Sequence, residues 1–106
     1  MPKYLVEANY TGEGLKGLIN EGGSSRRAVV EKLIGSVGGT VEAFYYAFGD
    51  TDLFVIADLP DNVTAASLSL TVSAVGTATS KVTVLVTAEE VDAAVKKSPS
   101  YRPPGQ

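Results

Sequence analysis

The middle of the chain predicts a β-hairpin whose two strands are apolar on both sides. One strand spans residues 40–48 and the other spans residues 53–59. The loop Gly49-Asp50-Thr51-Asp52 between them has the glycine and aspartate content of a tight reversal. Strands that are apolar on both sides predict a sheet covered on both faces. Because 106 residues provide too few helices for two covers, we expect a second copy of the protein to supply one of them.

Ahead of the hairpin, the pattern predicts one strand and two helices. Residues 3–10 alternate with a period of two, which is typical of a strand. Thr11 stands where a helix N-cap belongs, and the apolar residues that follow recur at helical spacing: Leu15, Leu18, Ile19. A second helix follows a pair of glycines, with Ser24 or Ser25 as its expected cap. Its apolar stripe is Val29, Val30, Leu33, Ile34 and Val37, and Gly38-Gly39 ends it.

After the hairpin, residues 63–75 fit two patterns. Leu68, Leu70 and Val72 alternate as in a strand, whereas Ala65, Leu68, Val72 and Val75 form a helical stripe. We predict a helix, because Asp61 or Asn62 offers a cap and Gly76 offers an end. A strand over residues 81–86 and a helix opening at Thr87 and ending before Ser98-Pro99 complete the prediction.

This order of elements predicts an α+β fold, a ferredoxin-like βαββαβ arrangement with an antiparallel sheet and an added C-terminal helix. We expect residues 1–98 to form a single domain and residues 99–106 to form an extended, proline-rich tail. Both main helices should cover one face of the sheet. The other face would then pair with a second copy, as in a dimeric α/β barrel. The strand over residues 40–48 presents either Val41, Ala43, Tyr45 and Ala47 or Glu42, Phe44, Tyr46 and Phe48 to that interface.

Composition removes several classes of function. Nine Lys and Arg against twelve Asp and Glu give a net charge of -3, so we expect neither a nucleic acid nor a membrane as partner. The chain has no Cys and no His, which excludes thiolate chemistry and the usual histidine bases and ligands. We therefore expect no metal and no cofactor, and any catalysis would use carboxylates, Lys, Tyr or Arg. No secretory signal is evident, which favours a cytoplasmic location.

One polar motif suggests an anion site. Ser24, Ser25, Arg26 and Arg27 follow Gly22-Gly23 at the predicted start of a helix. Free amides, two hydroxyls and two guanidiniums suit a phosphate or a carboxylate. The spacing is not that of a P-loop, and an ordinary serine cap followed by two solvated arginines explains the same residues.

Carboxylates and phenols provide the other candidates. Glu7 and Glu42 interrupt apolar strands, and in a desolvated interface cavity either would be a general base with Tyr10, Tyr45 or Tyr46 as a phenol donor beside it. Alternatively, the glutamates lie at sheet edges or pair with Lys3, Lys81 or Arg27. The acidic residues around the hairpin match no calcium loop and are better explained as solvated turn residues: Asp50, Asp52, Asp58 and Asp61.

Four segments resemble one known family. Tyr4-Leu5-Val6-Glu7-Ala8, the turn over residues 22–27, residues 43–52 and Leu59-Pro60-Asp61-Asn62 are together similar to the GYD domain family. The resemblance implies a ferredoxin-like fold, the dimeric α/β barrel assembly and a small bacterial protein without an assigned reaction. The chain departs from the family's name at one position, because Thr51 stands where a tyrosine is expected.

Three functions follow from this sequence as expectations. The first is a homo-oligomer, most simply a dimer, that binds a small organic molecule at or near the subunit interface. The second is a cofactor-independent isomerase or monooxygenase-like enzyme that uses carboxylate and tyrosine acid-base groups. The third is a regulatory module that responds to an anion at residues 24–27.

Overall fold

The computed structural model describes all residues from 1 to 106 and contains four strands and four helices. In chain order these are β1 (Lys3–Tyr10), α1 (Gly12–Glu21), α2 (Gly23–Ser36), β2 (Thr40–Tyr46), β3 (Leu53–Asp58), α3 (Asn62–Val75), β4 (Ala78–Leu85) and α4 (Ala88–Lys97). The sheet order is β2-β3-β1-β4, and every neighbouring pair is antiparallel. This is the α+β, ferredoxin-like arrangement that the order of elements predicted.

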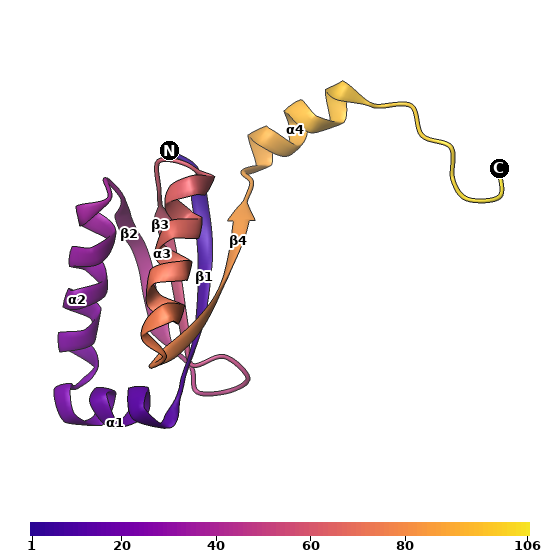
Figure 1. Ribbon diagram of the computed structural model, residues 1–106. Helices are drawn as coiled ribbons and strands as arrows, with labels where there is room; N and C mark the ends of the chain where they lie inside the picture. The colour runs from indigo at the N-terminus through magenta and orange to yellow at the C-terminus, as the bar shows by residue number, and fades with distance from the viewer.

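The helices α2 and α3 lie on one face of the sheet and leave the other face open (Figure 1). The residues of β3 alternate between buried and half-buried, because one face of the sheet is covered by helices and the other is open. The core lies between the sheet and the two helices, and Tyr4 and Leu59 are its largest fully buried side chains. Its other members are mostly small or branched: Ala8, Ile34, Leu53, Val55, Ala57 and Ala65.

The open face carries a continuous row of apolar side chains. Ile56 of β3 is paired with Leu5 of β1 on one side and with Ala43 of β2 on the other. Residues that pair across antiparallel strands share a face, so these three lie together, and Tyr45 continues the row beside Phe54. Tyr45 is 71% exposed. The predicted second apolar face is therefore present, and nothing in the single chain covers it.

A β-bulge breaks the simple alternation predicted for β2. The pairing with β3 shifts between Val41 and Ala43, so Glu42 occupies the extra position. Val41, Phe44 and Tyr46 pack against the core on the helix side. Beyond the inserted residue, the positions of β2 that point to each face are reversed. Neither of the two residue sets predicted for this strand therefore lies entirely on one face.

The α2 helix begins differently from the prediction. Its N-cap is Gly22, and no side chain caps it. Ser24 and Ser25 are already inside the first turn, so the prediction that one of them is the cap is wrong. Gly22 has a φ of 86°, which favours glycine, and its amide also closes α1 by donating to the Leu18 carbonyl at 2.7 Å. One glycine thus ends α1 and begins α2.

Other element boundaries follow from pairing and capping. Strand β2 ends at Tyr46, two residues before the predicted end, and Phe48 beyond it has a φ of 56°. Strand β4 begins at Ala78, three residues earlier than predicted, because it pairs with β1 as far as Tyr10. The helix predicted after Asp61 is confirmed as α3, with Asp61 as its N-cap and Gly76 as its left-handed end.

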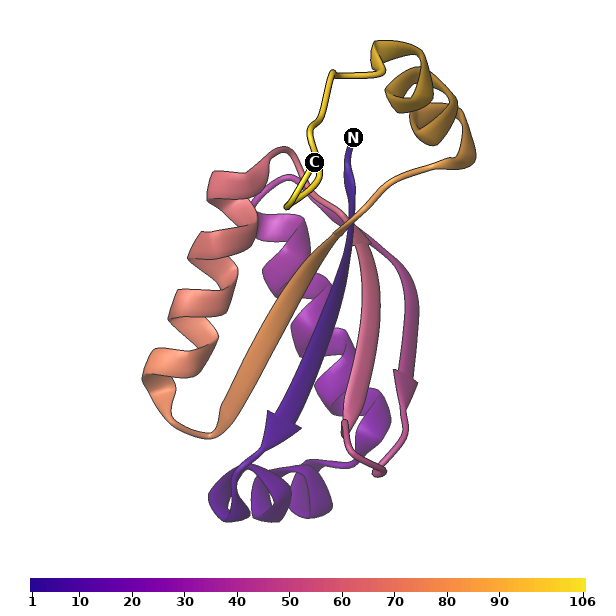
Figure 2. The same cartoon turned by 90° about the vertical axis from the view of Figure 1, so that its right-hand side faces the viewer.

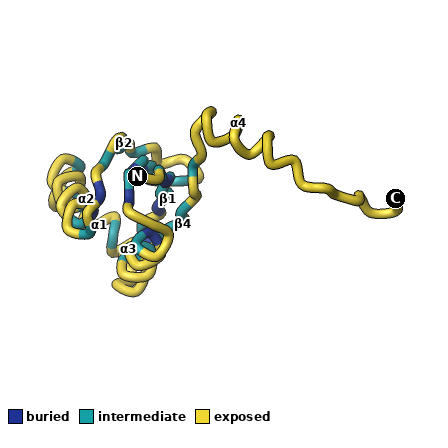
Figure 3. The backbone as a smooth tube through the Cα atoms, turned by 90° about the horizontal axis from the view of Figure 1, so that it is seen from above, coloured by how far each residue is buried: buried dark blue, intermediate teal, exposed yellow.

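The C-terminal helix α4 and the residues after it project from the body on the side of the open face (Figures 1 and 2). Thr87 and Glu90 form a reciprocal capping box that explains where the helix begins. No residue of α4 is buried, and Val95 is 67% exposed (Figure 3). No helix or strand follows Lys97. None of the four helices combines the length and the apolar character that crossing a membrane requires.

Candidate functional site

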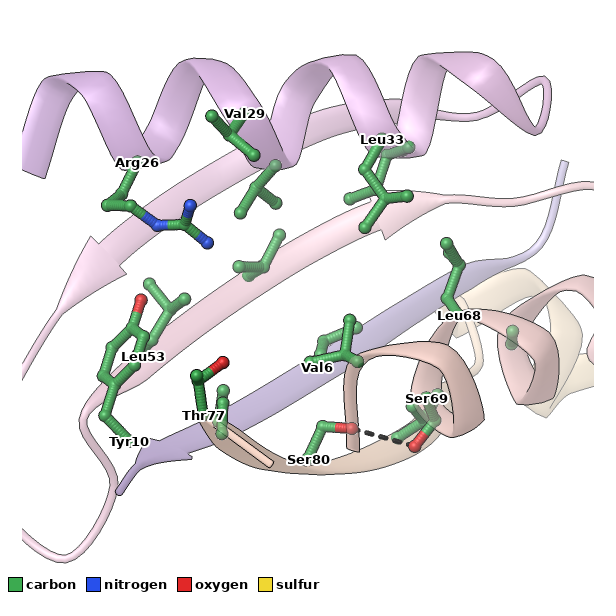
Figure 4. Close-up of a pocket in the computed structure, with 18 of the residues that line it drawn as sticks. Val6, Tyr10, Arg26, Val29, Leu33, Leu53, Leu68, Ser69, Thr77 and Ser80 are labelled. Atoms are coloured by element: carbon green, nitrogen blue, oxygen red, sulfur yellow. Dashed lines mark hydrogen bonds between the residues drawn. The ribbon is translucent and has the colours of Figure 1, made fainter. Parts of the chain in front are cut away.

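A cavity of about 140 Å³ lies between α2, α3 and the helix-covered face of the sheet (Figure 4). Fifteen of the 19 residues that line it are hydrophobic. Several of the side chains that line it are small, among them Ala8 and Ala78 of the sheet and Ala65 of α3. The walls are completed by branched residues, among them Val30, Leu33, Leu68 and Val82. The cavity can therefore accept a compact apolar molecule.

Two groups of polar side chains line this cavity. Ser69 of α3 and Ser80 of β4 form a hydrogen bond of 2.8 Å between their hydroxyls on the wall made by these two elements. Figure 4 places the guanidinium of Arg26 close to the hydroxyl of Tyr10 at one end, with Thr77 beside them. Arg26 is the one charged residue that lines the cavity. The cavity thus has one cationic end and one wall whose hydroxyls are paired.

The phenols near Arg26 are neutral at physiological pH. Burial is the main reason that the pKa of Tyr10 lies above its ordinary value, the neighbouring Tyr46 raises it further, and Arg26 opposes both. Burial likewise raises the pKa of Tyr46, against the attraction of Arg26. A neutral phenol donates a hydrogen bond but is a poor base. These tyrosines can orient a ligand more readily than they can remove a proton from it.

The predicted anion site is divided by the fold. Arg26 lines the main cavity, whereas Ser24 and Arg27 line a separate, open hollow of about 130 Å³ together with Gly23, Phe44 and Tyr46. Ser25 lines neither of them. Arg27 is exposed and lies 3.8 Å from Glu31 of its own helix. The four residues do not converge on one point.

The candidate bases Glu7 and Glu42 and the phenol Tyr45 lie on the open face of the sheet. Glu42 lies on the open face, where its carboxylate is 3.0 Å from the Lys3 ammonium. Glu7 accepts a hydrogen bond of 3.4 Å from the Thr51 hydroxyl, and Tyr45 is exposed nearby. None of these residues lines either cavity. The pairing of Glu42 with Lys3 is one of the alternatives that the sequence had left open.

Tyr46 instead lies on the helix-covered face. Its hydroxyl donates to the Gly23 carbonyl at 3.0 Å, its ring meets Phe44 edge-on at 5.3 Å, and it stacks on Phe48 at 5.7 Å. These contacts fix the ring between β2 and the start of α2. Tyr46 therefore borders the smaller hollow and supports the position of α2 over the main cavity.

The aspartates around the hairpin have separate structural roles. Asp52 accepts from the Tyr10 amide at 2.9 Å, Asp58 pairs with Lys3 at 2.9 Å, and Asp61 accepts from the Thr64 amide at 2.8 Å as the cap of α3. No three carboxylates in the chain come close enough together to hold a metal ion. Local hydrogen bonds and ion pairs therefore account for the presence of these three aspartates.

The cavity itself was not predicted from the sequence. Tyr10 belongs to β1, Arg26 to α2, and Thr77 to the turn between α3 and β4. Ser69 and Ser80 come from α3 and β4, on either side of that turn. The available signal was the small size of two residues on predicted apolar faces, Ala8 in the first strand and Ala65 in the helical stripe. Small residues leave volume only if the backbones around them stay apart, which sequence spacing does not reveal.

Comparison with known proteins gives one match. The family model of the GYD domain matches residues 4–95, which include β1 from its second residue, the other three strands and the helices α1, α2 and α3. No curated protein and no solved structure is similar enough to this chain to count as a match. The matched segment begins at the buried Tyr4 and contains every residue that lines the cavity. The chain therefore belongs to the GYD domain family.

Proposed function

We propose that this protein is a homo-oligomer, most simply a dimer, in which each subunit binds a small organic molecule between α2, α3 and the sheet. The observation that carries the proposal is the cavity of about 140 Å³ with its predominantly apolar lining. An apolar cavity of this size is close to the roughly 150 Å³ of an engineered cavity that stays dry and binds benzene. A single ring or a compact branched body matches the available volume.

The energetics favour a ligand. A molecule that fills the cavity removes its apolar walls from water, which is favourable by roughly 25 cal/mol per Å² of apolar surface buried. A dissociation constant of 1 mM already requires about 4 kcal/mol, and each tenfold gain in affinity requires about 1.4 kcal/mol more. A physiological ligand therefore needs at least one polar anchor in addition to the apolar contacts.

Binding is better supported than catalysis. Glu7 and Glu42, the carboxylates of an acid-base mechanism, lie across the sheet from the cavity. The titratable residues that line the cavity are Tyr10 and Arg26, which are a neutral phenol and a permanent cation at physiological pH. Neither is suited to act as a general base near neutrality. The arrangement favours holding a molecule over transforming it.

Self-association is supported by the side of the sheet that lacks helices. Leu5, Phe54 and Ile56 lie there only half-buried, with Tyr45 exposed beside them. A second sheet packed on this face would remove the row from water, at roughly 25 cal/mol per Å² of apolar surface. The helix α4 projects on the same side and presents Val91 and Val95 to solvent. A second copy against the open face would lie within reach of α4.

Ligand binding can be tested with toluene as a neutral apolar probe and ¹H–¹⁵N NMR as the readout. We expect millimolar toluene to shift the amides of residues around the cavity and to raise the melting temperature. Val72→Phe, which places a ring in the cavity, should abolish both effects. Val63→Phe is the matched control, because Val63 lies on the same helix but is 79% exposed and does not line the cavity. Unchanged spectra of the wild-type protein with toluene would refute the proposal.

Oligomerisation is tested separately by sedimentation velocity at several concentrations. We expect the wild-type protein to sediment above its 11.0 kDa monomer mass and Ile56→Glu to sediment as a monomer. Val63→Glu places the same charge on an exposed helical position and should leave the assembly intact. A wild-type protein that stays monomeric at 100 µM would contradict self-association but would leave the cavity experiment unaffected.

A further inference from the structure

We propose that the molecule bound in the cavity is a small monocarboxylate with a compact apolar body, held by Arg26 through its carboxylate. This inference rests on the proposed function, because it concerns the same cavity. It adds the chemical class of the ligand and the residue that selects it. The argument depends on the charge, the hydrogen-bonding capacity and the volume of the site.

The charge of the cavity has one sign. Arg26 is the single charged residue among the 19 that line it, and no carboxylate faces it there. The side chain of Arg26 is 32% exposed, so most of its surface is removed from water. A partly desolvated guanidinium beside apolar walls attracts an anion more strongly than a solvated one does. A neutral or cationic ligand would form no ion pair with this guanidinium.

Two groups approach the donors of Arg26, the Glu21 carboxylate and the Tyr10 hydroxyl. The ion pair joins Nη1 of Arg26 to Oε2 of Glu21 at 3.5 Å, which is long, and Glu21 lies outside the cavity with its side chain 45% exposed. A guanidinium has five N–H donors in a planar fork, so the remaining ones can hold a carboxylate through two parallel hydrogen bonds. An exposed pair of this length competes weakly with such a contact.

Tyr10 supplies a second donor at the same end. Figure 4 shows its hydroxyl directed toward the Arg26 guanidinium from the opposite wall. Burial keeps the phenol protonated, so it can donate to an oxygen held by Arg26. The uncapped amides at the start of α2 belong to residues that do not line this cavity, so Arg26 and Tyr10 are the groups that would hold the anion at this end.

The apolar volume limits the rest of the ligand. A cavity of about 140 Å³ accommodates a single aromatic ring or a similarly compact hydrocarbon. The wall formed by Ser69 and Ser80 offers little to a second polar group, because their hydroxyls already bond to each other at 2.8 Å. A molecule with one anionic end and one apolar end therefore fits, and phenylacetate is a suitable probe.

The test compares three probes of similar shape by isothermal titration calorimetry: phenylacetate, 2-phenylethanol and phenethylamine. We expect phenylacetate to bind about 10-fold or more tightly than 2-phenylethanol, since charge-assisted hydrogen bonds are about twice as strong as neutral ones. Phenethylamine should bind weakest. Raising NaCl from 50 to 300 mM should weaken phenylacetate binding and leave 2-phenylethanol binding unchanged.

Substitution of the arginine identifies its role. Arg26→Met should remove the preference for phenylacetate while 2-phenylethanol still binds, and Arg26→Lys should retain part of the preference. Arg27→Met is the control, because Arg27 is exposed, does not line the cavity and should leave both affinities unchanged. Equal binding of phenylacetate and 2-phenylethanol by the wild-type protein would overturn the carboxylate assignment and leave the proposed function standing. Failure of both probes to bind would overturn both.

Discussion

The hydroxyl of Tyr46 donates a hydrogen bond of 3.0 Å to the carbonyl of Gly23 and thereby ties β2 to the first residue of α2. The two residues also limit each other sterically, because a Cβ atom on Gly23 would lie 3.0 Å from Cε2 of Tyr46. Arg26 follows three residues later in the same turn. The contact therefore sets the position from which Arg26 reaches the cavity.

Tyr46→Phe should lower the free energy of unfolding by about 1 kcal/mol, since it removes one partly buried hydrogen bond and keeps the ring contacts with Phe44 and Phe48. Urea denaturation measures the change. Tyr101→Phe, in the exposed tail, should change the stability by less than about 0.5 kcal/mol. Equal effects of the two substitutions would mean that the Gly23 contact does not stabilise the fold.

Gly39→Ala should destabilise the protein strongly, whereas Gly17→Ala should stabilise it. A Cβ atom on Gly39 would lie 2.6 Å from the Asp58 carbonyl oxygen and 2.9 Å from Cγ2 of Ile34, so backbone or core must shift. Overpacking of this kind costs roughly 1–3 kcal/mol. A Cβ atom on Gly17 meets nothing within 4 Å, and alanine in a helix is favoured over glycine by about 0.5–1 kcal/mol. Thermal and urea unfolding of both variants test the contrast, which the reverse order would contradict.

Stability should fall at both ends of the pH range because of the ion pairs of Lys3. The hydrogen bond from Lys3 keeps the pKa of Asp58 below its ordinary value of 3.8, so its contribution is present above that pH and is lost as the pH falls through the lowered pKa. The hydrogen bonds to Asp58 and then Glu42 raise the pKa of Lys3 above 10.5, so its contribution is lost as the pH rises through the raised pKa.

The measurement is the urea midpoint between pH 2 and pH 11. Asp58→Asn should flatten the acid side of the profile, because the carboxylate that Lys3 stabilises is no longer there. Asp50→Asn removes an exposed loop carboxylate that makes no ion pair, and the profile should keep its wild-type shape. An acid limb that is the same in all three proteins would show that the Lys3 contacts do not couple folding to pH.

Val91→Asp with Val95→Asp should weaken self-association at least 10-fold without unfolding the body. These side chains form the exposed apolar face of α4, and an isolated ten-residue helix is marginal in water without a surface to pack on. Sedimentation velocity gives the association constant, and NMR spectra report the fold. Ala93→Asp lies on the opposite side of the same helix and serves as the control. Unaltered association of the double variant would exclude α4 from the contact between copies.

Local chemistry made several elements predictable from the sequence. Asp61 and Gly76 mark the two ends of α3, and Thr87 marks the start of α4, because caps act through atoms only a few residues apart. The ferredoxin-like arrangement followed from the succession of elements along the chain. The open apolar face was foreseen from strands that carry apolar residues on both sides.

Short-range patterns along the chain were enough to predict the set of elements, their order and the two apolar faces of the central strands. Three-dimensional packing was needed to learn which face the helices cover, that a bulge at Glu42 shifts the register of β2, and that Gly22 begins α2. It also decided that Arg26 turns into a cavity with Tyr10, while Glu7 and Glu42 remain across the sheet. The physical reason is that caps and periodicity act over a few residues. A cavity depends on the distance between packed elements, which small differences in side-chain volume across many positions set together.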